Sequence, residues 1–532
     1  GREDLSIQHL LALATWKLGR PTALTWSREE SMIGHFKRHP IAVKCRWGAT
    51  HEGKITAVQA EVIADGGAYA STSVEVTKVA ALFASGCYEV PNITVDGYAV
   101  YTNNIPCGAF RGFGAPQAQF AAEIMVTRLA HALDIDPVEL RRRNIYREGS
   151  IEPTQQPLPP GVSALPVLER CVEEARERLG YGLEPSDASR KPSAVSRQLS
   201  AVSCQPSAVS YQPSAISHQP SVVSTQHPAP STQHPTPPPH LRRGVGIACG
   251  IKNIGYSFGF PEQSTATVEI FGGATMEHAH VRAGVADVGQ GTHLILRQIA
   301  AETLRLPFEK IQMITDDSSE TPNSGSASAS RLTLMAGRAV KDAAEAALVA
   351  WEDEDRPARA TVQYRPPATT KLDPTTTAGR PNYAYGYAAQ AVEVEVNTLT
   401  GQVQVLSVIS VHDVGKAINR QQVEGQIEGC LAQALGYALL EHFQVRNGYI
   451  LTPHFSTYLL PTALDMPVEI VPVLLELADP NGPYGARGVA EMPLVPFAPA
   501  VAAAIHDATG AWLADQPMTP ERVLKALQTP AS

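Results

Sequence analysis

The stretch VEVEVNTLTGQVQVLSVISV, residues 392–411, alternates apolar and polar side chains on both sides of a turn. Period-two alternation around a turn that ends in Gly401 predicts a β-hairpin. The segment 421–440 follows it directly and has apolar residues at helical spacing, namely Val423, Ile427, Leu431 and Leu435. A hairpin joined to an amphipathic helix indicates an α+β fold class.

The earlier part of the chain has the same mixture of patterns. Residues 58–62 alternate with period two and run into Asp65-Gly66-Gly67, which predicts a half-buried strand and a turn. The segment after Pro116 predicts an amphipathic helix with one apolar side made of Phe120, Ile124, Leu129 and Leu133. Further helices are expected at 293–304, from about Leu332, and at 498–508.

A repeat of period seven, with units such as PSAVSYQ and PSAISHQ, fills residues 191–240. Proline in most units removes helix hydrogen bonds at about 3 kcal/mol each, so a coiled coil is excluded and a disordered linker is expected. We therefore predict two similar-sized mixed α/β lobes, 1–184 and 241–532, separated by a low-complexity linker at 185–240.

Composition excludes several classes of function. No apolar run approaches the roughly 20 residues that span a bilayer, so no membrane partner is expected. A net charge of -9 without a basic stripe argues against nucleic acid. The seven cysteines are scattered and odd in number, which gives neither a disulfide framework nor a cysteine metal site and fits a cytoplasmic location.

Four segments combine small residues with polar groups that suit a cofactor or a substrate. Residues 289–292, GQGT, open a predicted helix whose backbone N–H groups are suited to an anion. In 321–330, small residues and hydroxyls either pack against a polar ligand or place Ser330 as a helix N-cap. Both interpretations stay open for 321–330, whereas GQGT taken alone favours a structural role.

The two other segments each carry one charged residue. Residues 108–117, GAFRGFGAPQ, place Arg111 and two aromatic residues among glycines before a helix. Residues 488–494, GVAEMPL, enclose Glu491 between apolar neighbours, which suits either a buried ion pair or a proton acceptor. Taken singly, each segment fits a structural role better than a catalytic one.

In their order along the chain, these segments closely resemble the large subunit of the xanthine dehydrogenase and aldehyde oxidase family of molybdenum hydroxylases. The motifs that carry the resemblance are GAFRGFGAPQ, ADVGQGTH (286–293), PNSGSASASRLT (322–333), HDVGKAINRQQVEGQIEG (412–429) and GVAEMPL. The resemblance covers nearly the whole chain outside the repeat.

The resemblance implies a molybdopterin cofactor that holds molybdenum through its dithiolene, with no protein ligand to the metal. Both the plain pterin and its cytosine dinucleotide form remain open. It further implies a hydroxylase acting on an N-heteroaromatic, purine-like substrate or on an aldehyde. The electrons would pass to [2Fe-2S] and FAD groups on partner subunits, so a hetero-oligomer is expected.

The resemblance also assigns roles to individual residues. Glu491 matches the active-site base and Arg111 the arginine beside the metal. Phe113 and, after a short gap, Phe258 match the aromatic residues that stack on the substrate, and Glu3 matches a polar anchor. The positions that match cofactor contacts are Phe110, Gly112, Gln290, Gly291, Ser330, Thr333 and Gln426.

Two departures from the family pattern, at the chain start and at Val79, limit these assignments, and Phe110 disfavours a carbon monoxide dehydrogenase. The chain begins inside the family's glycine-rich cofactor loop, at Gly1-Arg2-Glu3, so we expect the rest of that loop to be missing. Val79 stands where purine-oxidising relatives carry an arginine, and Phe110 stands where carbon monoxide dehydrogenases carry a cysteine. The alternatives are an aldehyde oxidoreductase and a truncated, non-catalytic subunit that only binds partners.

Overall fold

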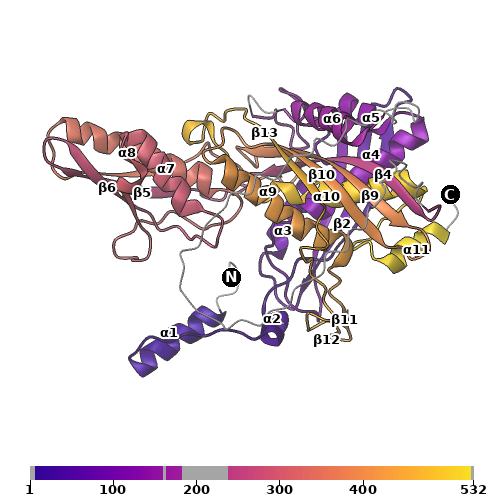
Figure 1. Ribbon diagram of the computed structural model, residues 1–532, viewed down its shortest axis with the longest axis horizontal. Coiled ribbons are helices and arrows are strands. Elements are labelled where there is room, and N and C mark those ends of the chain that lie inside the picture. The colour runs from indigo at the N-terminus through magenta and orange to yellow at the C-terminus, as the bar shows by residue number, and fades with distance from the viewer. Residues whose placement is uncertain (1–5, 160–162, 183–237, 529–532) are drawn as a thin grey trace, which may run out of the picture.

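The computed structural model describes residues 6–159, 163–182 and 238–528, and a four-stranded sheet lies in its larger part (Figure 1). The strands, in the order β13-β10-β9-β4, are β13 (Glu469–Leu475), β10 (Val403–Asp413), β9 (Tyr385–Asn397) and β4 (Leu241–Asn253). Strands β9 and β10 pair antiparallel, so the predicted hairpin is confirmed. Strand β13 joins the edge of β10 in parallel.

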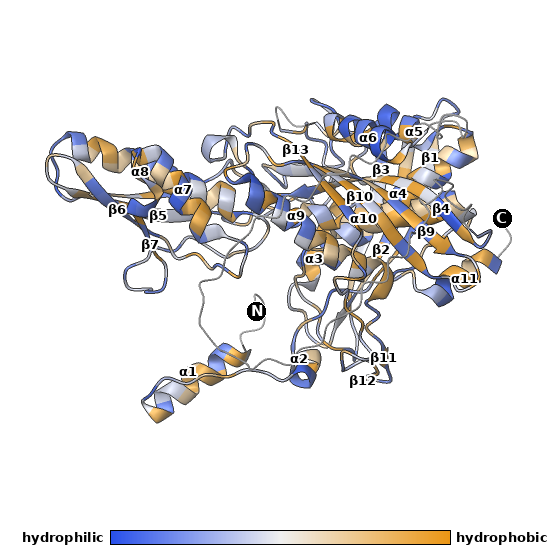
Figure 2. Cartoon of the chain, viewed as in Figure 1, coloured by the Kyte–Doolittle hydropathy of each residue, from blue (hydrophilic) through white to orange (hydrophobic). Residues whose placement is uncertain are grey.

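Both faces of this sheet are buried. Side chains alternate between the two faces along each strand. On β9, Tyr385 and Tyr387 belong to one buried cluster, whereas Val392 and Val394 belong to a second. The first cluster includes helix α6 (Leu165–Leu179), and the second includes helices α9 (Arg420–Leu435) and α10 (Phe497–Thr509). Strands β9 and β10 are accordingly among the most hydrophobic elements in Figure 2.

Helix α10 lies unusually close to β4. A Cβ atom on Gly246 would lie 2.2 Å from the carbonyl oxygen of Ala500, so only glycine fits at this strand position. The predicted helices at 498–508 and 421–440 are confirmed, except that the chain after Leu435 continues as a π-helical turn, Gly436–Leu440.

The first part of the chain forms a three-stranded sheet with helices on it. Its strands are β1 (Ile41–Ala49), β2 (Ile55–Gly67) and β3 (Asn92–Tyr101), and its helices are α3 (Ser73–Leu82), α4 (Ala115–Leu133) and α5 (Pro137–Asn144). The predicted strand at 58–62 lies within β2, which runs on through Gly67. The predicted helix after Pro116 is α4.

Residues 264–364 form a small lobe at one end of the molecule, on the left of Figure 1. Its sheet, in the order β7-β6-β5-β8, contains β5 (Ser264–Gly272), β6 (Met276–Arg282), β7 (Ile311–Ile314) and β8 (Ala358–Tyr364). The predicted helices α7 (Thr292–Leu304) and α8 (Leu332–Glu352) pack with this sheet around one apolar cluster.

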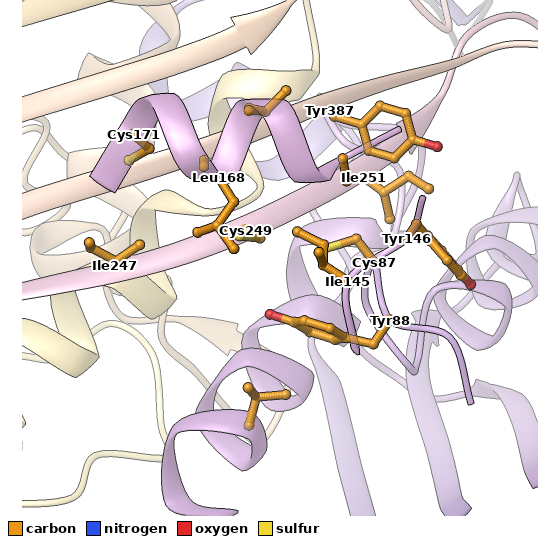
Figure 3. Packing of buried hydrophobic residues seen from close by; sticks show 14 of the residues in the cluster. Cys87, Tyr88, Ile145, Tyr146, Leu168, Cys171, Ile247, Cys249, Ile251 and Tyr387 are labelled. Carbon is orange, nitrogen blue, oxygen red and sulfur yellow. The ribbon is translucent and has the colours of Figure 1, made fainter. Parts of the chain in front are cut away.

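The fold is α+β, as predicted, and the parts of the chain before and after the repeat share one core. Figure 3 shows Cys87 and Tyr88, from the first part, beside Cys249 and Ile251 of β4. The repeat interpreted as a linker lies outside the described residues up to residue 237. The domain boundaries therefore stay a prediction.

The remaining elements are short or peripheral. They are α1 (Ser6–Leu18), α2 (Arg28–Gly34), β11 (Val445–Arg446), β12 (Tyr449–Ile450), α11 (Pro520–Gln528) and the 3₁₀ turns Phe308–Lys310, Pro483–Gly485 and Met492–Leu494. Within the described ranges, every helix is too short or too polar to cross a bilayer.

A buried ion pair between helices α4 and α5 also contacts the second part of the chain. The Arg141 guanidinium on α5 donates to the Glu123 carboxylate on α4 at 2.7 Å, and each side chain is 1% exposed. Glu123 also accepts hydrogen bonds from the Tyr88 hydroxyl and from the backbone N–H of Cys249 on β4. Buried charges persist only when they are paired in this way.

We predict that Glu123→Gln lowers the free energy of unfolding by about 3–5 kcal/mol, because it leaves the Arg141 charge buried without a counter-charge. Urea denaturation measures this loss. The control is Glu169→Gln, which removes a 2.8 Å ion pair with Arg142 in which the side chains are 44% and 27% exposed. That variant should lose at most about 1 kcal/mol, and equal losses in both variants would refute the prediction.

A second buried carboxyl, that of Glu152, has no ion pair of this kind within the described residues. Its residue is 7% exposed, and burial raises the pKa of Glu152 to about 7, although the Tyr385 hydroxyl and the Arg380 charge oppose the shift. A folded-state pKa above the ordinary 4.5 means that the stabilising proton is fully bound below about pH 4.5. This contribution is lost as the pH rises through about 7.

Glu152→Gln removes this titration, so we expect the variant to be more stable than the parent above neutral pH and similar to it in acid. Melting temperatures measured at about pH 5 and about pH 8 test the sign. Glu177→Gln, at an exposed position of α6, serves as the control. A Glu152→Gln variant that loses stability at the higher pH contradicts the prediction.

Candidate active site

The Glu491 side chain is buried and held by donors from two distant segments. Its residue is 7% exposed and lies directly before the turn Met492–Leu494. The backbone N–H of Gly112 donates to Oε1 at 3.2 Å, and the Ser330 hydroxyl donates to Oε2 at 3.4 Å. These contacts bring three predicted site residues together and fix the orientation of the carboxylate.

Ser330 does not cap the helix that follows it. Helix α8 begins at Leu332, its N-cap position is Arg331, and no side chain among the described residues caps it. Ser330 has a left-handed φ of 51°, and its hydroxyl accepts from the Glu491 backbone N–H at 3.1 Å. The N-cap interpretation is therefore wrong, because the Ser330 hydroxyl bonds to Glu491 instead.

The backbone at Gly488 lies very close to Ser330. A Cβ on Gly488 would lie 1.8 Å from the Ser330 carbonyl oxygen, so this close contact requires glycine.

Arg111 fastens its loop to the backbone beside Glu491. Its Nε donates to the Ala490 carbonyl oxygen, and its Nη2 donates to Gln426 Oε1 at 3.2 Å. Its Nη1 reaches Gln433 Oε1 at 3.3 Å. The structure thus brings predicted residues Arg111, Gln426 and Glu491 into one cluster with helix α9.

Lys252, at the end of β4, is a member of the site that the sequence did not predict. Its residue is 3% exposed, and its Nζ lies 3.7 Å from Glu491 Oε2. The sequence did contain a signal for it, because Lys252 directly follows the apolar run in GVGIACGIKN. A lysine in such a run is expected to be buried, and charged side chains are rarely buried without a partner.

The predicted anion site at 289–292 is filled by a side chain of the chain itself. Asp287 Oδ1 accepts from the backbone N–H groups of Gly289 and Gly291 at 2.9 and 3.3 Å, and Oδ2 accepts from His293 at 3.2 Å. Burial tends to raise the pKa of Asp287, yet these three donors hold it below its usual value. An aspartate two residues before a glycine is a known turn signal, and the prediction overlooked it.

Gln290 points back into the same loop. Its Oε1 accepts from Val288 N at 2.6 Å, and its Nε2 donates to the Ala286 carbonyl oxygen and to Thr292 Oγ1. Both amide hydrogens of Gln290 are thus engaged within the loop, and its Oε1 keeps one lone pair for a further donor. Thr333 lies partly buried in the first turn of α8. Glu3 lies outside the described residues.

The cluster has the properties of a site for a polar cofactor. A Cβ on Gly291 would lie 2.5 Å from the Gln422 amide nitrogen of α9, so the small lobe approaches α9 through bare backbone. Two buried polar atoms beside the predicted residues, Gln422 Oε1 and Arg38 Nη1, have no hydrogen-bond partner in the described part of the chain. Arg38 stacks on the half-exposed ring of Phe110, 4.3 Å from its centroid. The bare Gly291 backbone and these unpartnered polar atoms fit a polar ligand.

The two predicted stacking residues hold left-handed backbone conformations, with φ of 49° at Phe113 and 58° at Phe258. Non-glycine residues adopt this conformation mainly at turns and functional sites. Both rings are partly buried against the first core cluster. Phe258 also lines a cavity of about 1780 Å³, together with Glu152, Ser257 and Lys371.

Comparisons with known proteins find relatives along nearly the whole chain. Residues 1–145 match one model of a molybdopterin cofactor-binding domain, and residues 225–355 and 346–467 match a second model of that description. A probable xanthine dehydrogenase subunit of Bacillus subtilis is 30% identical over 99% of this chain and 67% of its own length. An aldehyde oxidoreductase of Megalodesulfovibrio gigas is also 30% identical, over 98% of this chain and 52% of its own length.

Solved structures give the same assignment. The aldehyde oxidoreductase of Desulfovibrio desulfuricans superposes with a TM-score of 0.81 at 28% identity, over 98% of this chain and 52% of that chain. Quinoline 2-oxidoreductase of Pseudomonas putida, at 23% identity and a TM-score of 0.75, supports the fold alone. The chain spans between about half and two thirds of the length of these relatives. It belongs to the xanthine dehydrogenase and aldehyde oxidase family of molybdenum hydroxylases and is a molybdopterin-binding chain of that family.

Proposed function

We propose that this chain carries the substrate-oxidising site of a hydroxylase that inserts oxygen from water into a carbon–hydrogen bond. One substrate C–H group and one water give one C–OH group, two protons and two electrons. The buried Glu491 carboxylate supports this proposal best, because Gly112 and Ser330 fix its orientation. A proton acceptor with a fixed direction is what such a reaction requires from the protein.

Molybdopterin with molybdenum supplies the activated oxygen and the two-electron acceptor when it is bound. The residues proposed to hold it are Phe110, Gly112, Gln290, Gly291, Ser330, Thr333 and Gln426. Glu491 accepts the proton that the attacking oxygen loses. Arg111 anchors the backbone at Ala490 and so keeps that carboxylate in place.

The proposed substrate is a flat N-heteroaromatic ring, with Phe113 and Phe258 stacking on it and Glu3 as a polar anchor. Val79, at the position of the purine-binding arginine, is 3% exposed in the core and offers no polar group. An aldehyde is therefore the second candidate, and one relative at 30% identity is named for that activity. Rates with a panel of purines, quinolines and aldehydes distinguish the two classes.

The two electrons leave through iron–sulfur and FAD groups that we propose lie on partner subunits. Several relatives are named as subunits, among them the xanthine dehydrogenase molybdenum-binding subunit of Escherichia coli O157:H7. The competing function is a non-catalytic subunit that only binds partners. A molybdenum content near one per chain in the purified complex would exclude it.

In the complete enzyme, Glu491→Gln should slow single-turnover hydroxylation by about 10²–10⁴, because a positioned base contributes a factor of that size. The measurement is stopped-flow reduction by substrate at equal molybdenum content. Glu169→Gln, at a partly exposed ion pair far along the chain, should leave the rate unchanged. A Glu491→Gln rate within a few-fold of the parent would remove Glu491 as the base.

A further inference from the structure

Lys252 is a buried cation in direct contact with the proposed base. Its side chain is 4% exposed, that of Glu491 is 9% exposed, and the two charged groups are 3.7 Å apart. Taking an ammonium group out of water costs several kcal/mol unless a counter-charge compensates it. Burial accordingly lowers the pKa of Lys252, and the Glu491 charge acts in the opposite direction. Each charge of the pair therefore depends on the other.

The other charged and titratable groups around Glu491 make their closest contacts elsewhere. Arg111 donates to the Ala490 carbonyl and to the amides of α9. Arg38 stacks between the rings of Phe110 and Tyr437, at 4.3 and 5.0 Å. Cys430, from α9, is fully buried, and burial raises its pKa to about 11. Among the described residues, Lys252 is the cation within ion-pair distance of the Glu491 carboxylate.

The position of the Lys252 ammonium group is itself fixed by the next residue. Its Nζ donates to the Asn253 carbonyl oxygen at 3.2 Å and to Asn253 Oδ1 at 2.5 Å. The side-chain nitrogen Nδ2 of Asn253 donates to the Gly255 carbonyl oxygen and to the Ser257 hydroxyl, both at 2.9 Å. This chain of bonds links the Glu491 carboxylate to the turn that precedes Phe258.

We propose that Lys252 is a positioning residue for Glu491, which holds the carboxylate ionised and fixed against the Gly112 and Ser330 donors. The reaction role of Glu491 rests on the proposed function, but the ion pair itself does not. An opposite charge within about 4–6 Å favours the charged form of a carboxylate, and Lys252 Nζ lies 3.7 Å from Glu491 Oε2. A protonated Glu491 cannot accept the proton that the attacking oxygen loses.

The test needs no cofactor. Infrared difference titration of the purified chain, with a Glu491→Gln spectrum subtracted, follows the carbonyl band of the protonated Glu491 carboxyl. In Lys252→Met the band should persist to a pH at least about one unit higher than in the parent, and in Lys252→Arg it should return toward the parent value. Lys78→Met, which breaks an ion pair with Glu75 at a 49% exposed lysine, should leave the band unchanged.

The loaded enzyme provides the second measurement. Lys252→Met should move the acid limb of kcat to higher pH by the same amount, with the rate recovering in alkali, while Glu491→Gln lacks this limb. An unshifted carboxyl band in a folded Lys252→Met protein overturns the proposal. If Lys252→Met does not fold, a Lys252→Arg band equal to that of the parent supports it, and a band moved to higher pH overturns it. An active Glu491→Gln enzyme refutes the base role alone and leaves the infrared result to decide on Lys252.

Discussion

The buried contact between Glu123 and Arg141 is the constraint on which the rest of the structure depends. It places two charges in a core that excludes water, and the same carboxylate binds the backbone of β4 at Cys249. Helix α4 comes from the part of the chain before the repeat and β4 from the part after it. The Glu123 carboxylate therefore helps to align two segments more than a hundred residues apart.

The candidate site depends on the same alignment. Gln119, one turn before Glu123, binds the backbone of Ile251 through both ends of its amide, at 2.6 and 2.9 Å. Lys252 is the next residue of β4, and Gly112 lies just before the start of α4. The register between α4 and β4 thus brings the ammonium group and the backbone donor to the same carboxylate. The packing of α4 on β4 therefore determines the geometry of the site as well as that of the core.

Local periodicity was enough to predict several elements of the fold. The hairpin at 392–411, the helix after Pro116 and the helix at 421–440 depend on side-chain patterns that operate over a few residues. The arrangement of strands and helices in space was not predictable in this way. It depends on contacts between distant segments, such as those of α6 with β9 and β10. The shared core was missed for the same reason, since nothing local in Glu123 indicates that it binds Cys249.

Some residues of the site were predictable from local motifs, and others were not. Glu491, Arg111, Gln426 and Ser330 were named from motifs, and the structure brings these four together. Lys252 was missed because its partner, Glu491, lies 239 positions further along the sequence. A buried lysine is recognisable only once its burial is known. The aromatic pair and the cofactor contacts stay predictions based on resemblance.

The cap that Asp287 forms on the GQGT turn has a thermodynamic consequence. Three backbone N–H groups that suit an anion already bind a carboxylate tethered a few residues away. A tethered group has a high effective concentration, so Asp287 is an internal competitor for any anionic ligand that approaches this helix end. The affinity measured for such a ligand is then the difference between two sets of similar hydrogen bonds. Geometric fit at this turn therefore matters more than charge.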